Sequence, residues 1–226
     1  MIYATMCVGS EWTASYKEAI NHFSKNHTLH ILTDDTSLFS NSICYEYTRN
    51  IFSYYEKINF ILKLSKKYKE RIYYIDVDWL SSYNTDIKLT DNAIYTYRNF
   101  ILNEKNAVTA FFTETELLIR KTILSKIGIN KTLKDYIGEA LIIFPYNENI
   151  DNIISDSKIL QKYLENLYHK ESITKKRLNR YKKGIGYAEG WGLTALVTKY
   201  NIPIKQIDWR KKTILWNYQK KYLIIL

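Results

Sequence analysis

The chain has 226 residues, with 33 Lys and Arg against 23 Asp and Glu and a formal net charge of +10. A hydrophobic content of 46% excludes intrinsic disorder, and 7 glycines with 2 prolines exclude a collagen-like or linker-like chain. The length predicts a single domain over residues 1–226. Two cysteines and the lack of an apolar run of about 18 residues indicate a cytoplasmic protein without a membrane span.

The first part of the chain alternates between predicted strands and helices. An apolar strand over residues 2–8 is followed by an amphipathic helix over 13–26 and a short strand over 30–33. A second amphipathic helix is predicted over 51–68, and a strand over 71–75. Short connections between these elements predict β-α-β units, and hence an α/β fold with a parallel sheet.

The second part continues the same alternation. Strands are predicted over residues 107–112, 140–144 and 204–209, and helices over 114–126, 159–168 and 191–200. Residues 175–186 are predicted to form a basic loop or a frayed helix. Neither an internal repeat nor a low-complexity linker interrupts the pattern.

The excess positive charge lies in the last quarter of the chain. Residues 170–226 hold 14 Lys and Arg against 3 acids, a net charge of +11, whereas the other 169 residues hold 19 and 20, a net charge of −1. A local excess of this size predicts an anionic partner, either a phosphate-bearing ligand or a nucleic acid. The alternative is a solvated basic face without a partner.

Two carboxylates follow the predicted strand over residues 71–75. Asp76 and Asp78 stand at positions i and i+2, and open α/β sheets bind their ligands at the carboxyl ends of strands. Because paired carboxylates attract a hard cation, they predict a Mg²⁺ or Mn²⁺ site that bridges to nucleotide phosphates. One alternative is a solvated turn capped by Asp78. Another is a haloacid-dehalogenase-like phosphatase, which the following Trp79 and Leu80 disfavour because that family continues with small residues.

The order of motifs resembles that of the GT-A type glycosyltransferases. The opening strand over residues 2–9, the acidic segment 31–35 and the strand ending at 75–78 follow in the order typical of these enzymes. The resemblance implies a single-domain, Rossmann-like α/β fold with a mixed, mainly parallel sheet flanked by helices. It also implies hexosyl or pentosyl transfer from a nucleoside diphosphate sugar such as a UDP-sugar. Residues 1–100 would form the nucleotide-sugar half and residues 101–226 the acceptor half.

The same resemblance implies which residues line the donor site. Asp76 and Asp78 would hold Mn²⁺ or Mg²⁺ at the diphosphate. The nucleoside would be bound by residues at the end of the first strand and in the acidic segment, namely Ala4, Thr5, Cys7, Asp34 and Asp35. The alternative for the last two is a turn in which they cap a helix.

Two glutamates are candidates for catalysis. Glu139 and Glu189 lie in segments rich in small residues, which in GT-A enzymes lie near the sugar and the acceptor. Either carboxylate would serve as a general base on an acceptor hydroxyl or stabilise an oxocarbenium-like centre. The alternative for Glu189 is a favourable position at a helix N-terminus. The last histidine, His169, has no motif around it, so the third metal ligand stays open.

The basic segments predict contacts with phosphate groups. Lys182 and Lys183 lie in a loop that would close over the donor diphosphate. The predicted nucleic-acid contacts are Arg177, Arg180, Arg210, Lys211 and Lys212. A packed edge strand with a solvated basic side explains the C-terminal segment nearly as well.

The sequence leaves more than one acceptor molecule to be considered. A cytoplasmic enzyme with a cationic quarter favours DNA that carries hydroxymethylated bases, and bacteriophage enzymes that glycosylate such DNA fit this description. A bacterial surface glycan is the alternative acceptor. A non-enzymatic nucleic-acid-binding protein, in which the acidic pairs are structural, is the alternative from another class.

Overall fold

The computed structural model describes residues 1–49, 52–83, 89, 91–96, 99–101, 114–138, 140–174, 188–207, 214–217 and 222–225. The strands are β1 (Ile2–Cys7), β2 (Leu29–Thr33), β3 (Ile43–Glu46), β4 (Ile72–Ile75), β5 (Ile94–Thr96), β6 (Asn99–Ile101), β7 (Asp135–Ile137), β8 (Leu141–Phe144), β9 (Ile204–Gln206), β10 (Ile214–Asn217) and β11 (Tyr222–Ile225). The helices are α1 (Ser10–Ser24), α2 (Glu56–Tyr68), α4 (Glu114–Thr122), α5 (Ile150–Thr174) and α7 (Ala188–Lys199), with short 3₁₀ turns η1 (Thr36–Leu38), η2 (Val77–Ser82) and η3 (Leu124–Ile127).

A seven-stranded sheet organises the chain, with the strand order β3-β2-β1-β4-β8-β5-β9. β8 pairs antiparallel with β4 and β5, and the other pairings in this sheet are parallel. The predicted α/β fold with a mixed, mainly parallel sheet is therefore confirmed. Because β8 lies between β4 and β5, the two predicted halves of the chain contribute to one sheet. The pairs β6-β7 and β10-β11 form two small antiparallel ribbons.

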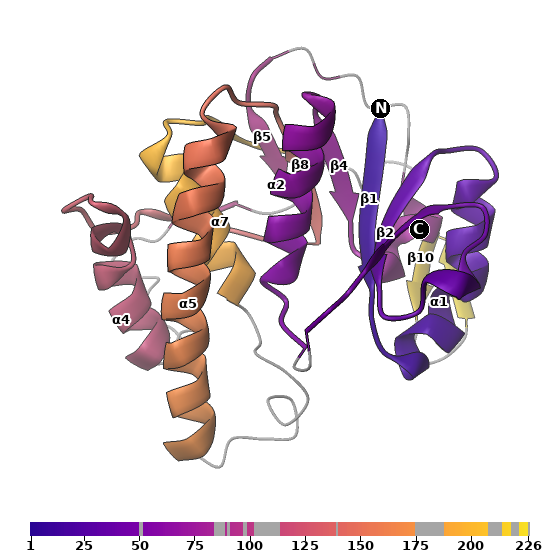
Figure 1. Ribbon diagram of the computed structural model, residues 1–226, viewed down its shortest axis with the longest axis horizontal. Helices are drawn as coiled ribbons and strands as arrows, with labels where there is room; N and C mark the ends of the chain where they lie inside the picture. The colour runs from indigo at the N-terminus through magenta and orange to yellow at the C-terminus, as the bar shows by residue number, and fades with distance from the viewer. Residues whose placement is uncertain are drawn as a thin grey trace.

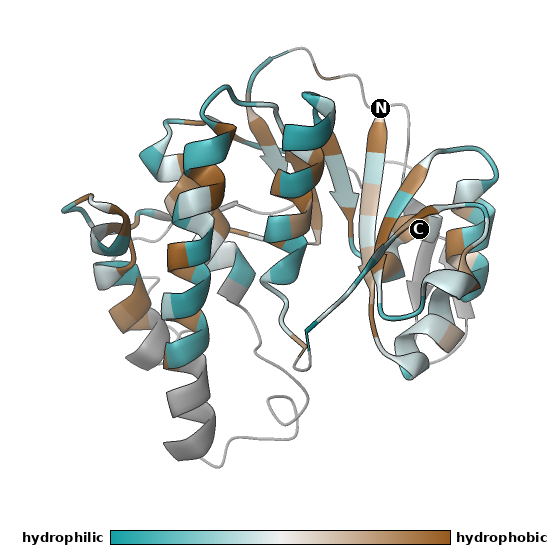
Figure 2. Cartoon of the chain, in the orientation of Figure 1, coloured by the Kyte–Doolittle hydropathy of each residue, from teal (hydrophilic) through white to brown (hydrophobic). Residues whose placement is uncertain are grey.

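Helices cover both faces of the sheet, as Figure 1 shows, with α1 on one face and α2, α5 and α7 on the other. Each face has its own apolar core, because side chains alternate along a strand. In β1, Ala4 and Met6 face the α2 side, whereas Tyr3 and Cys7 face the α1 side. Burial on both faces explains why the strand is continuously apolar in sequence. Figure 2 shows the same arrangement, with hydrophobic strands inside and hydrophilic helix surfaces outside.

Several elements differ from the sequence-based prediction. The short strands β3 and β5 were not predicted, because three or four residues give little periodicity. α5 begins at Ile150 rather than at 159, although residues 147–157 are rich in Asn, Asp and Ser, which favour turns. Its first turn is held by Asn147, whose side chain accepts a hydrogen bond from the Asn149 amide at 2.8 Å. The strand predicted over 107–112 lies outside the described residues.

α7 passes unusually close to the start of α2. A Cβ atom placed on Gly192 would lie 2.3 Å from the Tyr55 ring, and Tyr55 is fully buried. The Tyr55 hydroxyl also accepts a hydrogen bond from Ser157 on α5 at 3.3 Å. Glycine at position 192 therefore allows three helices to meet around one tyrosine.

A buried histidine makes stability depend on pH. The Nδ1 atom of His30 on β2 lies 3.2 Å from the Tyr45 hydroxyl, and burial, together with the positive charge of Lys67, lowers the pKa of His30 from 6.5 to about 4. Between these pH values the unfolded chain binds a proton that the folded chain excludes. The free energy of unfolding should therefore decrease as the pH falls from 6.5 to 4, by up to about 1.4 kcal/mol per pH unit from this group.

Chemical denaturation of the wild type and a His30→Phe variant at several pH values measures this contribution. The aromatic replacement keeps the packing against Tyr68 but cannot take up a proton. Its stability should fall less steeply over this interval, and parallel curves for the two proteins would contradict the prediction.

No helix among the described residues is both long enough and apolar enough to cross a membrane.

Candidate functional site

The site lies at the carboxyl end of the central strand β4. The backbone amide of Asp76 donates a hydrogen bond to the Ala140 carbonyl at 2.9 Å, and the amide of Trp79 donates to the Asp76 carbonyl at 2.8 Å. The chain thus turns from β4 directly into η2. This tight turn brings Asp76 and Asp78 to the wall of one pocket, so the sequence-predicted carboxylate pair is close in space.

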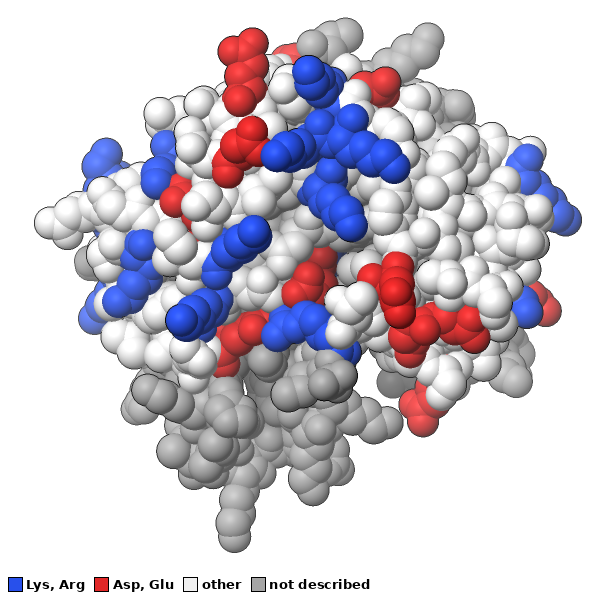
Figure 3. Space-filling view, viewed as in Figure 1, with Lys and Arg blue, Asp and Glu red and all other residues white. Residues whose placement is uncertain are grey.

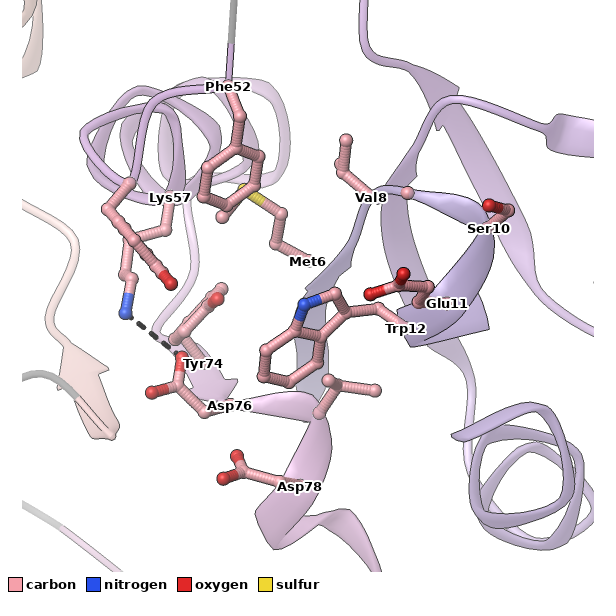
Figure 4. Close-up of a pocket in the computed structure, with 13 residues that line it drawn as sticks. Met6, Val8, Ser10, Glu11, Trp12, Phe52, Lys57, Tyr74, Asp76 and Asp78 are labelled. Carbon is pink, nitrogen blue, oxygen red and sulfur yellow. Dashed lines mark hydrogen bonds and ion pairs between the residues drawn. The ribbon is translucent and has the colours of Figure 1, made fainter. Parts of the chain in front are cut away.

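The pocket has a volume of about 670 Å³, within the range typical of small-molecule sites. Its walls come from the ends of β1 and β4, the first turn of α1 and the segment that leads into α2, as Figure 4 shows. The lining residues are Met6, Val8, Gly9, Ser10, Glu11, Trp12, Phe52, Tyr54, Lys57, Tyr74, Asp76, Val77 and Asp78.

Lys57 lines the pocket but was not predicted from the sequence. It changes the chemistry of the site more than any other residue that was not predicted. Its side chain is 3% exposed, and its ammonium lies 3.0 Å from Asp76 Oδ1 and 3.4 Å from Glu189 Oε1. The ammonium also lies 5.5 Å from the centre of the Tyr74 ring. A sequence signal was present, because Lys57 shares the apolar stripe of α2 with Ile61 and Leu64, at i+4 and i+7.

The pocket wall carries more negative than positive charge. Among the described lining residues, Glu11, Asp76 and Asp78 are acidic and Lys57 is basic, and Lys57 is already shared between two carboxylates. Partial loss of hydration and the charge of Asp76 raise the pKa of Asp78 to about 6. Burial, and then the charge of Asp76, raise the pKa of Tyr74 well above its usual value. A site of this charge attracts a cation, or an anion that arrives with one.

The surface of the molecule also shows acidic and basic side chains mainly in separate groups. On the face shown in Figure 3, one group of acidic side chains lies right of and below the centre, whereas Lys and Arg side chains lie mainly over α2 and α5, with a few acidic side chains among them.

The donor set suits a hard divalent cation. Two carboxylates on one wall provide the oxygen ligands that Mg²⁺ and Mn²⁺ prefer. The described residues contain no group of three or more His, Cys, Asp or Glu able to hold a metal. In nucleotide sites, Mg²⁺ is usually held by one or two carboxylates, with phosphate oxygens and water as the other ligands.

A tight turn joins β1 to α1 at the edge of the pocket. Gly9 has a φ of 98°, a left-handed conformation that favours glycine, and its amide donates a hydrogen bond to Asp34 Oδ2 at 2.9 Å. Asp35 accepts hydrogen bonds from the amide and the hydroxyl of Ser37, at 3.0 and 2.6 Å. Asp34 thus shapes the turn and Asp35 caps η1, as the alternative interpretation of this pair expected. A nucleoside contact of either residue remains a prediction.

The three predicted nucleoside contacts on β1 are buried away from the pocket lining. Ala4, Thr5 and Cys7 are each at most 1% exposed, and burial raises the pKa of the Cys7 thiol to about 11. Met6 and Val8 line the pocket instead. Thr5 and Cys7 alternate with Met6 along the strand and so face the other side of the sheet, which a continuous apolar run conceals. Ala4 shares the face of Met6 but lies further from the end of the strand.

The predicted catalytic and basic residues divide into two groups. Glu189 is described: it lies in the first turn of α7, as the helix-dipole interpretation expected, and contacts Lys57 rather than lining the pocket. The others lie outside the described residues, namely Glu139, Arg177, Arg180, Lys182, Lys183, Arg210, Lys211 and Lys212.

Aromatic rings also line the pocket. Trp12, 46% exposed, stacks on Tyr16 with ring centres 5.4 Å apart. Figure 4 shows Trp12 and Phe52 reaching into the pocket from different walls, and Phe52 packs edge-on against Tyr54. These rings were not predicted from the sequence, although a tryptophan two residues after Gly9-Ser10 was a visible signal.

Comparison with known proteins finds similarity to solved structures but not to sequence families. No protein-family model and no curated protein matches the sequence. Among solved structures, the glycosyltransferase GlyE of Streptococcus pneumoniae TIGR4 aligns with a TM-score of 0.43 and 9% identity, over 92% of this chain and 45% of that one. The chain thus spans less than half the length of that structure. Similarity at this level assigns no activity to the chain.

Proposed function

We propose that this protein is a metal-dependent glycosyltransferase that moves a hexosyl or pentosyl group from a nucleoside diphosphate sugar, a UDP-sugar first of all, to an acceptor hydroxyl. The observation that carries this proposal is the placement of Asp76 and Asp78. Both follow the end of a central strand and line one pocket that also contains the aromatic rings of Trp12 and Phe52.

Each wall of the pocket suits one part of such a donor. Asp76 and Asp78 supply oxygens for Mn²⁺ or Mg²⁺, which when bound would neutralise the charge of the departing diphosphate. Lys57 holds Asp76 in place through the 3.0 Å ion pair. Trp12 and Phe52 offer flat apolar surfaces against which a base or a sugar ring can stack. Because the wall is acidic, a diphosphate without a cation would be repelled.

A thermal-shift panel tests the donor half of the proposal. Nucleoside diphosphate sugars are added with and without Mn²⁺, since a ligand that binds the folded state raises its stability by RT ln(1 + [L]/Kd). At 100 times Kd the stabilisation is about 2.7 kcal/mol. We expect a shift for at least one donor only when Mn²⁺ is present. The absence of any shift would favour the non-enzymatic alternative.

For the acceptor we propose an anionic molecule, with DNA that carries hydroxymethylated bases as the first candidate. The support is the net charge of +11 in residues 170–226. A surface glycan is the competing acceptor.

Binding to duplex DNA should weaken steeply as salt rises. Reversing Lys182, Lys183, Arg210 and Lys211 to glutamate should reduce both the affinity and its salt dependence, whereas a Glu148→Lys variant should not. Fluorescence anisotropy at several salt concentrations measures this, and the lack of any DNA affinity at low salt would favour the glycan.

A further inference from the structure

A buried carboxylate lies behind the pocket. Glu189 is 3% exposed and begins α7, yet it does not belong to the pocket lining. Its Oε2 atom has no hydrogen-bond partner among the described residues. A carboxylate in such a position is costly unless a positive charge compensates it.

Lys57 supplies that charge and connects Glu189 to the pocket. The ammonium lies 3.4 Å from Glu189 Oε1 and 3.0 Å from Asp76 Oδ1. Asp76 and Lys57 line the pocket, whereas Glu189 lies beyond them. The order Asp76, Lys57, Glu189 therefore leads from the pocket wall into the core, and Lys57 is the described residue whose ion pairs link Glu189 to the pocket wall.

Glu189 compensates part of the positive charge of Lys57. Lys57 is 3% exposed and lies against the rings of Tyr54 and Tyr74, so its ammonium depends on nearby carboxylates for compensation. A cation bound at Asp76 from the pocket side would weaken the attraction between Asp76 and Lys57. Glu189 is then the counter-charge that keeps the ammonium buried beside Asp76.

We propose that Glu189 is a positioning residue that holds the Lys57 ammonium against Asp76 and touches neither the donor nor the acceptor. The expected effect of Glu189 on catalysis rests on the proposed function. The geometry that the proposal requires exists in the protein without ligand, so the proposal is also testable without turnover.

The test uses a double-mutant cycle. The proteins are the wild type, Glu189→Gln, Lys57→Met and the double variant, with the exposed Glu148→Gln as a matched control. The glutamine keeps the shape of Glu189 but removes its charge, and methionine keeps the length of the lysine stem. Residues that act through one contact give non-additive effects, whereas independent residues give additive ones.

The first readout needs no substrate. In protein labelled with ¹⁵N-lysine, the NζH₃ group of Lys57 should give a resonance protected from exchange, assigned by its loss in Lys57→Met. Glu189→Gln should remove or broaden this resonance, and Glu148→Gln should leave it intact. An unchanged resonance in Glu189→Gln would overturn the proposal. If Glu189→Gln alone fails to fold and the double variant folds, that rescue supports the coupling; additive losses of stability contradict it.

The second readout is kcat and KM with the donor found in the thermal-shift panel. Glu189→Gln should lower kcat/KM at least about tenfold in the wild-type background. In the Lys57→Met background the same change should have less than about a twofold effect. Effects that multiply across the cycle would show that Glu189 acts on the substrate directly and would overturn the proposal. If the wild type turns over no donor, the proposed function fails and the resonance alone decides the inference.

Discussion

An Asp78→Asn variant is expected to lose at least about 100-fold in kcat/KM for sugar transfer, equivalent to about 2.7 kcal/mol of transition-state stabilisation. The substitution removes one of the two carboxylates on the pocket wall that we propose as oxygen ligands of the metal. Its fold should remain intact, because burial and the charge of Asp76 raise the pKa of Asp78 to about 6 and thus oppose its ionised form. A neutral asparagine relieves that repulsion.

An Asp76→Asn variant is expected to lose activity to a similar extent and stability as well. Asp76 is the nearer ion-pair partner of the buried Lys57, and removing it leaves Glu189 as the carboxylate beside the ammonium. The free energy of unfolding at pH 7 should therefore fall by about 1–3 kcal/mol. The two variants thus separate the catalytic effect from the structural one.

Transfer rates with Mn²⁺ and chemical denaturation measure both effects. An Asp151→Asn variant is the matched control, since Asp151 is an exposed aspartate that pairs with Lys66 on α2. Turnover within twofold of the wild type in both pocket variants would refute the metal assignment.

A Trp12→Ala variant is expected to bind the sugar nucleotide at least about tenfold more weakly. Stacking of an aromatic side chain on a base contributes about 1–3 kcal/mol in alanine substitutions, and Trp12 presents its ring to the pocket while 46% exposed. A Trp12→Phe variant should recover most of the affinity, because it keeps a flat ring. Isothermal titration calorimetry with Mn²⁺ and the donor measures the change.

The matched control for Trp12 is Ile159→Ala. Ile159 is a large apolar residue on α5 that is 47% exposed and does not line the pocket. It should leave the affinity unchanged. Wild-type affinity in Trp12→Ala would exclude stacking on this ring and leave Phe52 as the candidate.

Part of the site could be predicted, because a local sequence motif indicates where its residues lie in the fold. Asp76 and Asp78 follow an apolar strand directly, so their place at a strand end could be inferred from the sequence. Ala4, Thr5 and Cys7 lie on β1, the end of which forms part of the pocket wall, but they are not among the lining residues. Which of the β1 side chains line the pocket could not be inferred, because a strand buried on both faces shows no alternation.

The sequence by itself determined the α/β class, the acidic turn after β4 and the separation of a nearly neutral body from a basic last quarter. These features depend on local pattern and on composition. Only the tertiary structure decided that β8 runs antiparallel between β4 and β5, and that Lys57, Asp76 and Glu189 share one charge network. These three residues are up to 132 positions apart in sequence, and an ion pair over such a distance exists only because the sheet and the helices packed on it bring the side chains together.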